Sequence, residues 1–349
     1  MKKITFVAFE DNANVFTNWS SFINEHSSKY QSKSLCLKKH PYNYSLQHDY
    51  DILSSSEEEL ENAREWLSDS DYIVYSEEDQ GCYFQYSTAT QLKISLGMDP
   101  IFDTMGKKVA FYSGTAYRKK SQMFNQMDKT SFDRILSPLD LYRLTNKDPK
   151  TGCIFMCEKS KMNPPSIKES IVERFSRPEW VISHTPTNRQ IKGSDFLLKI
   201  MEKIQSSSKN PIKYVEKSGL TPQESLDLKK ESCFYIDTLS IGLGISATGA
   251  HGISSLEALS YGNIVLSSTY NMEQKAINKA SLPFFDTEVE YPIRNLGQTV
   301  DSAYEQIEAV MNLDKNKLIE MALASYSWYE NTSTPEKFVE KFIYEIEQA

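Results

Sequence analysis

The chain has 349 residues, enough for two ordinary domains that each bury a core of their own. Its composition, 40% hydrophobic and 25% charged, is that of a globular protein and excludes a largely disordered chain. The formal net charge of −8 argues against nucleic-acid binding, because neutralising backbone phosphates requires a dense basic face. No window approaches the roughly 20 apolar residues that span a bilayer. We therefore expect a cytoplasmic protein, with peripheral contact at the inner face of the membrane left open.

Short β-rich runs alternate with longer amphipathic stretches along the first half, which predicts a parallel sheet with crossover helices. The predicted strands are 5–9, 34–37, 72–76, 108–112, 134–137 and 153–157. The predicted helices are 14–27, 57–67 and 83–95. Asp-x-Asp triplets stand at 49–51 and 69–71, but the second lies between a helix and a strand, where Asp is an ordinary turn residue. No His, Cys or carboxylate cluster has metal-ligand spacing, and we predict no metal site.

Helix-breaking residues cluster near mid-chain at 161–166 and 176–178, and we place the hinge between two domains there. This gives an N-terminal domain at 1–165 and a C-terminal domain at 166–330. Residues 331–349 are predicted to hold a final helix, because their apolar residues recur every four positions.

The second half repeats the strand–helix alternation. Its predicted strands are 180–184, 212–215, 233–237 and 264–268. Its predicted helices are 194–204, 221–231, 253–261 and 300–311. The helix start at Thr221 is the best marked, since Pro222 takes the first helical position and Glu224 completes a capping box.

Two cations stand between the strand 180–184 and the helix that begins near Ser194. Arg189 offers a planar fork for phosphate oxygens and Lys192 a point charge. Placed ahead of a helix N-terminus, the pair predicts a diphosphate site. The alternative is that both are solvated surface residues.

Glu257 lies one turn inside the helix predicted at 253–261. Its neighbours are apolar, which places it near the interior, where an unpaired carboxylate is costly. There it can accept hydrogen bonds from vicinal sugar hydroxyls. The alternative is an exposed residue that is favourable to the helix dipole.

A glycine-rich run at 241–252 precedes this helix. Its glycines let backbone amides approach phosphate or sugar, and His251 is a further candidate contact. The run is not a dinucleotide-binding fingerprint, because its spacing differs and it lies late in the chain. A flexible loop without function is the alternative.

Two of these segments resemble the donor-binding domain of glycosyltransferase family 4. One is the run 184–195, and the other is Leu-Glu-Ala at 256–258 with Gly262 and the strand that follows. The likeness is closest over 180–270, and in the first half it is carried by 11–15 and 112–118.

The resemblance implies an α/β protein of the GT-B fold, with two Rossmann-like domains whose parallel sheets face a central cleft. It implies a retaining glycosyltransferase that moves a hexose from a UDP- or GDP-sugar to a glycan, lipid-linked, protein or other hydroxyl acceptor, as in polysaccharide biosynthesis. No cofactor or metal is implied. The N-terminal domain would bind the acceptor, the C-terminal domain the nucleotide sugar, and the helix in 331–349 would cross back to the N-terminal domain.

The resemblance also implies roles for residues. Arg189 and Lys192 would be catalytic by stabilising the leaving diphosphate, and Glu257 would fix the ribose. The other donor-binding candidates are Asn188, Gly249, His251, Gly252 and Ile253. The candidates for the acceptor or diphosphate side are Asn12, Asn14, Ser113, Gly114 and Arg118. A simple helix cap is the alternative role for Asn12.

The chain departs from the family pattern at two places. Gly249 stands where many members carry a first Glu, and Ser113 precedes Gly114 where many carry a histidine. These departures leave open a catalytically inactive GT-B homologue that binds a sugar, a nucleotide or a partner as a scaffold. A nucleotide-sugar epimerase is a further alternative, which would carry more carboxylates and histidines.

Overall fold

A computed structural model describes residues 1–11, 14–37, 47–76, 93–98, 103–112, 132–138, 150–154, 164–241, 252–269 and 291–349. The chain forms two compact units. Unit 1 comprises Met1–Phe155 with Pro335–Ala349, and unit 2 comprises Met156–Thr334. Within the described ranges, no helix is long and apolar enough to cross a membrane.

Unit 1 is built on a seven-stranded parallel sheet in the order β3-β2-β1-β4-β5-β6-β7. Its strands are β1 Lys2–Ala8, β2 Tyr30–Cys36, β3 Tyr50–Asp51, β4 Tyr72–Ser76, β5 Lys107–Phe111, β6 Arg134–Pro138 and β7 Thr151–Ile154. Its helices include α1 Val15–His26, α2 Glu57–Ser68 and α14 Pro335–Glu347. The helix predicted at 83–95 lies outside the described residues except for its end.

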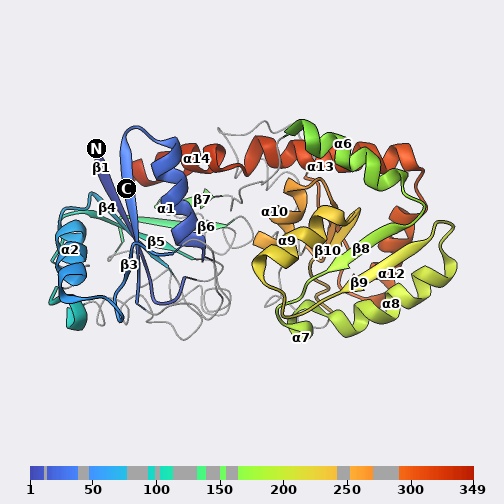
Figure 1. The fold of residues 1–349 in the computed structure, drawn as a ribbon, viewed down its shortest axis with the longest axis horizontal. Helices are drawn as coiled ribbons and strands as arrows, with labels where there is room; N and C mark the ends of the chain where they lie inside the picture. Colours follow the sequence, from blue (N-terminus) through green and yellow to red (C-terminus); the bar gives the residue numbers. More distant parts are fainter. Residues whose placement is uncertain are drawn as a thin grey trace. The chain divides into compact units, whose positions relative to one another are not determined.

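The two faces of this sheet carry different cores, since side chains along a strand alternate between faces. Phe6 points to the face covered by α1 and α14 (Figure 1), where its ring lies 5.0 Å from Phe16 and 5.5 Å from Phe342. Val7 points to the other face and joins the cluster that contains Trp66 and Leu67 of α2.

The last helix, α14, is fastened to unit 1 by aromatic and ionic contacts. The ring of Phe338 lies 4.6 Å from that of Trp19 in α1. The buried Glu345 carboxylate pairs with Arg134 of β6 and, at 2.7 Å, with Lys341 one turn earlier. The helix begins at Pro335, because residues 331 and 332 still belong to the preceding helix α13.

Unit 2 contains a five-stranded parallel sheet in the order β12-β11-β10-β8-β9. Its strands are β8 Trp180–His184, β9 Ile212–Glu216, β10 Phe234–Ile236, β11 Ile264–Ser267 and β12 Arg294–Asn295. Its helices include α6 Pro164–Ser176, α7 Arg189–Lys192, α8 Ser194–Ser207, α9 Pro222–Glu231, α10 Ile253–Ser260, α12 Val300–Met311 and α13 Lys315–Thr332. Helix α8 packs against α12, and α13 packs against α6 and α10 (Figure 1).

Of the residues expected from the sequence to form a hinge, 164–166 and Ser176 belong to helix α6, and 161–163 lie outside the described residues. Pro164 and Pro165 open α6, because the first turn of a helix tolerates proline. Arg174 of this helix is fully buried and donates to the backbone oxygens of Ser232 and Tyr261. Burial lowers the pKa of its guanidinium to about 10. Arg174 thereby ties α6 to the ends of α9 and α10.

Candidate functional site

The segment that follows β8 forms a short helix, which the sequence analysis did not predict. Asn188 caps the N-terminus of α7, and its side-chain Oδ1 accepts from the backbone N–H of Ile191 at 3.1 Å. Gly193 then takes a left-handed backbone conformation with φ 67°, and α8 starts at the next residue. Arg189 and Lys192 therefore stand on one turn of helix at the carboxyl edge of the unit 2 sheet.

His184, the last residue of β8, contacts both β10 and the start of α8. Its Nδ1 lies 2.8 Å from the carbonyl oxygen of Ile236, which can only accept, so Nδ1 carries the proton. Its Nε2 then accepts from the hydroxyl of Ser194 at 2.8 Å. Burial lowers the pKa of His184 to about 4, so the ring is neutral at pH 7. The histidine joins the start of α8 to β10.

Lys192 reaches across to the residues that follow β10. Its Nζ lies 2.5 Å from Asp237 Oδ1 and 2.9 Å from Thr238 Oγ1. Burial opposes both charges, but their mutual attraction outweighs it, so the pKa of Lys192 is raised and that of Asp237 is lowered. The pair is ionised. An ammonium has three N–H donors, and among the described residues these two contacts leave one for a ligand.

Arg189 is nearly half exposed and has two carboxylate partners. Its guanidinium pairs with Asp195 of α8 at 2.8 Å and with Glu216 at the end of β9. Glu216 is largely buried, with 11% of its side chain exposed. Arg189 is thus held at the rim of the sheet with part of its fork open to solvent.

Glu257 lies on α10 and is largely buried, as its apolar neighbours predict. Its carboxylate pairs with Nζ of Lys229, a residue of α9 whose side chain is 0% exposed. Lys229 also donates to Ser225 Oγ at 2.9 Å and stands 5.0 Å from the ring centre of Tyr235. The solvated alternative for Glu257 is therefore wrong.

Asp237 joins Lys192 to the N-terminus of α10. Its Oδ2 accepts from Ser255 Oγ in the first turn of that helix at 2.7 Å. A β-carbon built on Gly252, the N-cap residue, would lie 3.8 Å from the same oxygen. Ile253 opens the helix beside it. Lys192, Asp237 and the first turn of α10 consequently meet at one place, where open α/β sheets bind ligands.

Two residues of the candidate site, Asp237 and Lys229, were not identified by the sequence analysis. Asp237 carried a signal, since it is a polar residue directly after a buried strand. Lys229 carried none, because its partner Glu257 is 28 positions away and lysines on a helix are usually exposed.

The remaining candidates are placed as follows. Gly249 and His251 in unit 2 and Asn12, Ser113, Gly114 and Arg118 in unit 1 lie outside the described residues. Asn14 is buried in a left-handed conformation with φ 56°.

At the nearby N-terminus of α1, the backbone N–H groups bond to the carboxylate of Asp11. Asp11 accepts from the backbone N–H groups of Phe16 at 2.9 Å and Thr17 at 2.8 Å. Those amides are therefore engaged within unit 1. Burial raises the pKa of Asp11 against these hydrogen bonds and the nearby His48.

The aspartates of the Asp-x-Asp triplets contact strands β1 and β2 within unit 1. Asp49 accepts from the backbone N–H of Ser34 at 2.8 Å, and Asp71 from that of Lys3 at 2.7 Å. Asp69 pairs with the Lys3 ammonium at 2.5 Å. In the described part of the chain, no three His, Cys, Asp or Glu side chains gather to hold a metal ion.

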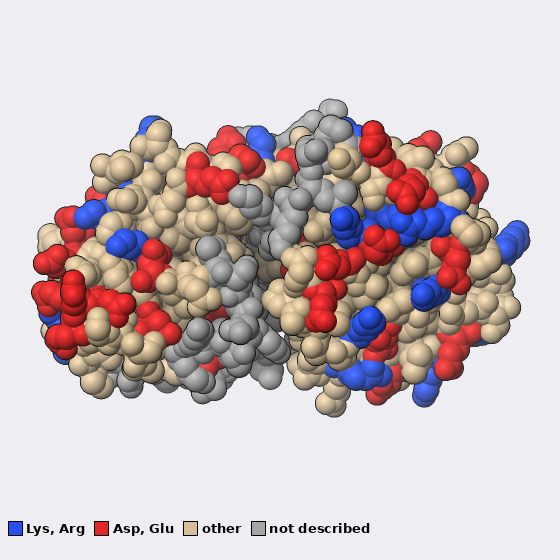
Figure 2. Space-filling model, viewed as in Figure 1, with Lys and Arg blue, Asp and Glu red and all other residues tan. Residues whose placement is uncertain are grey.

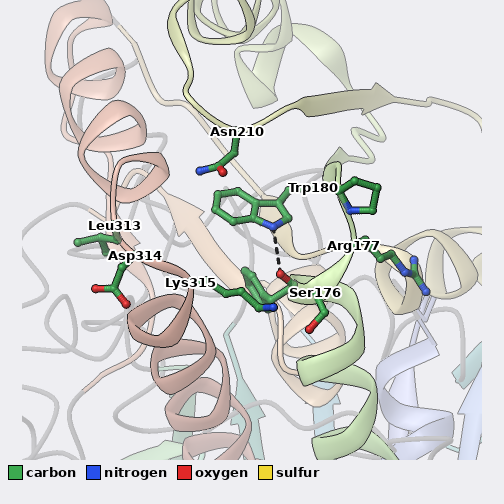
Figure 3. A pocket seen from close by; sticks show the side chains of 9 residues that line it. Ser176, Arg177, Trp180, Asn210, Leu313, Asp314 and Lys315 are labelled. Atoms are coloured by element: carbon green, nitrogen blue, oxygen red, sulfur yellow. Dashed lines mark hydrogen bonds between the residues drawn. The ribbon is translucent and has the colours of Figure 1, made fainter.

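A cavity of about 330 Å³ lies at the opposite end of β8 (Figure 3). Trp180, the first residue of the strand, lines it and donates its indole N–H to the Phe175 carbonyl oxygen at 3.4 Å. Arg177 lines it as well, but its guanidinium pairs with Glu231 at 2.9 Å and with Glu173 at 3.0 Å. The cavity is separate from the place where Lys192, Asp237 and α10 meet.

Comparison with solved structures shows what this architecture is similar to. No family model and no curated protein matches the sequence. An α-glucosyltransferase solved with UDP-glucose and DNA containing an abasic site superposes with a TM-score of 0.61 at 11% identity, over 99% of both chains. HepE of Anabaena, solved with UDP and glucose, gives 0.59 at 8% identity over 100% of both chains. The N-terminal domain of trehalose-6-phosphate phosphatase from Candida albicans gives 0.58 at 9% identity, over 99% of this chain and 96% of that one.

The chain has the GT-B fold. The fold class expected from the sequence is confirmed, with a parallel sheet in each unit. At identities of 8–11% the likeness establishes the fold and leaves the activity to the chemistry of the site.

Proposed function

We propose that the chain is a retaining glycosyltransferase, related to family 4, that transfers a hexose from a UDP- or GDP-sugar to a hydroxyl acceptor. The observation that carries the proposal is the meeting of Lys192, the first turn of α10 and, on the same helix, Glu257 in unit 2. A cation beside a helix N-terminus suits a diphosphate, and a largely buried carboxylate one turn along suits the hydroxyls of a ribose.

In the proposed reaction Lys192 and Arg189 stabilise the negative charge that grows on the departing diphosphate. The bond from the anomeric carbon to the phosphate oxygen breaks, and the acceptor oxygen bonds to the same face of that carbon. The acceptor proton passes to the leaving phosphate. Stabilisation of developing charge usually contributes more to an enzyme's rate than any other single effect, so these two cations are the proposed catalytic residues.

The other donor contacts stay proposals. Glu257 would accept from the ribose, with Lys229 holding its carboxylate in place. Asn188 would act near Arg189 while capping α7, and Gly249, His251, Gly252 and Ile253 would approach the phosphate or sugar. Unit 1 would bind the acceptor through Asn12, Asn14, Ser113, Gly114 and Arg118. We propose a cytoplasmic enzyme of polysaccharide biosynthesis.

Charge narrows the class of acceptor. The chain carries a net charge of −8, and on the face in Figure 2 acidic and basic side chains are interspersed over unit 2. The first turn of α2 adds Glu57, Glu58 and Glu59 to the surface of unit 1. A DNA acceptor would require a basic surface, so we propose a glycan, lipid-linked or protein acceptor.

A non-catalytic GT-B scaffold is the second candidate. Lys192 is paired with Asp237, and Arg189 with Glu216 and Asp195. Paired cations attract a diphosphate less strongly than unpaired ones. Gly249 and Ser113 stand in place of the family's acid and histidine. Together with the pairing of the two cations, these departures favour a protein without turnover.

A thermal-shift panel of UDP, GDP, ADP and CMP tests the proposal. One nucleoside diphosphate at 100 times its dissociation constant is expected to stabilise the protein by about 2.7 kcal/mol, while CMP gives no shift. Slow hydrolysis of the matching nucleotide sugar then separates an enzyme from a scaffold. A panel without any shift would contradict the glycosyltransferase and also a scaffold that binds a nucleotide.

A further inference from the structure

Asp237 is the most buried acid beside the proposed donor site, and both of its oxygens are engaged. The residue is 2% exposed and directly follows β10. Oδ1 binds the Lys192 ammonium at 2.5 Å, and Oδ2 accepts from Ser255 Oγ at 2.7 Å. Its backbone N–H is fixed as well, since it donates to the Leu266 oxygen at 3.0 Å. The carboxylate therefore has one fixed orientation.

We propose that Asp237 is a positioning residue, which keeps Lys192 charged and directed at the first turn of α10 for the donor diphosphate. This inference rests on the proposed function. A lysine has a flexible four-carbon stem and changes its pKa readily when buried. Here only about a quarter of the Lys192 side chain is exposed, so the ammonium requires a partner that compensates its lost hydration.

Among the groups around Lys192, Asp237 is the one that can compensate the lost hydration of its ammonium. Arg189 on the same turn carries a like charge, and the charge of Lys229 on α9 opposes that of Lys192. His184 at the end of β8 is neutral, and the Tyr235 hydroxyl of β10 bonds to Ser254 and Thr185. Asp237 is the carboxylate that contacts Lys192 in the part of the chain that the structure describes. Removing its charge should lower the pKa of Lys192.

Asp237 also carries a negative charge beside a site for an anion. Removal of this charge should change donor binding little, because the loss of its repulsion on the diphosphate offsets the loss of the placement of Lys192. Turnover should fall, because Lys192 is no longer held in place. A residue that merely supported the fold would not divide its effect between KM and kcat in this way, nor would it move the titration of one lysine.

The test compares the wild type with Asp237→Asn, Asp237→Glu and the control Asp195→Asn. Asp195 is the matched control, because its carboxylate pairs with the other cation, Arg189, while its side chain is 82% exposed. Competitive acetylation of the folded protein from neutral to alkaline pH, read by peptide mass spectrometry, gives the titration midpoint of Lys192 without any donor. The exposed Lys199 of α8 serves as the internal reference.

In the wild type Lys192 is expected to titrate at higher pH than Lys199. Asp237→Asn should lower the Lys192 midpoint by about one pH unit or more, while Asp237→Glu restores it and Asp195→Asn leaves it unchanged. With a nucleotide sugar, Asp237→Asn should lower kcat about tenfold or more and leave KM within about threefold. The alkaline limb of kcat should move to lower pH.

Two results would overturn the inference. One is a Lys192 midpoint below that of Lys199 in the wild type, a reading that holds even if Asp237→Asn does not fold. The other is an unchanged midpoint in folded Asp237→Asn. If the midpoint moves as expected but no nucleoside diphosphate binds, the proposed function fails and the ionic contact stands. If a diphosphate binds and the midpoint stays, only the role of Asp237 fails.

Discussion

Lys192→Ala is expected to lower kcat with the matching nucleotide sugar by a factor of about 10²–10³, the cost of one charge-stabilising contact in comparable sites. The reason is that the ammonium supplies a full positive charge at a largely buried position, where water replaces it poorly. Steady-state rates of transfer or hydrolysis measure the effect. Asp237 loses its cation in this variant but keeps the Ser255 hydroxyl, so circular dichroism should show a folded protein.

Lys199→Ala is the matched control for this variant. Lys199 lies on α8 in the same unit and is exposed, so its removal should leave kcat within about twofold of the wild type, as most surface substitutions are mild. Full activity of folded Lys192→Ala would refute the catalytic role of the cation.

Gly193→Ala is expected to destabilise unit 2 by about 2–5 kcal/mol, the sum of a dihedral cost and a steric one. A side chain is strained at the φ of 67° that Gly193 adopts, and its Cβ would lie 2.1 Å from the backbone oxygen of Leu239. Leu239 cannot withdraw freely, since its own N–H donates to the Lys192 oxygen at 3.0 Å. Urea unfolding followed by circular dichroism measures the loss.

Gly219→Ala separates the two causes. Gly219 has a φ of 72°, and nothing lies within 4 Å of an added Cβ. Only the dihedral cost of about 1–2 kcal/mol applies there. Equal losses in the two variants would show that the contact between Gly193 and the segment after β10 does not constrain the site.

Local signals in the sequence predicted much of the fold. The strand at 180–184 and the helix at 300–311 are confirmed to the residue. The capping box of Thr221 and Glu224 is present in the structure and starts α9 as predicted. The strands β3 and β12 were missed because two residues are too short to show a pattern.

Two long helices were also missed, for different reasons. In α6 the paired prolines resembled a break in the chain, although they occupy the first turn. In α13 polar and aromatic residues interrupt the apolar positions, and side chains such as Tyr326, Trp328 and Tyr329 are buried all the same. Tertiary packing decides such a helix more than its own periodicity.

The candidate site could be predicted only in part. The cations at 189 and 192 were visible as residues between a strand and a helix. Their partners were not, since Asp237 lies 45 positions from Lys192 and comes beside it only when β8 and β10 pair. Ion pairs between distant segments follow from the order of strands in the sheet, which spacing along the chain does not reveal.

A crystal structure with the nucleoside diphosphate that shifts the melting temperature would show directly whether the two cations bind a diphosphate. We expect phosphate oxygens within hydrogen-bond distance of Lys192 Nζ and the Arg189 guanidinium, and ribose hydroxyls that donate to Glu257. A nucleotide bound elsewhere, with Lys192 contacting only Asp237 and Thr238, would contradict the proposed site.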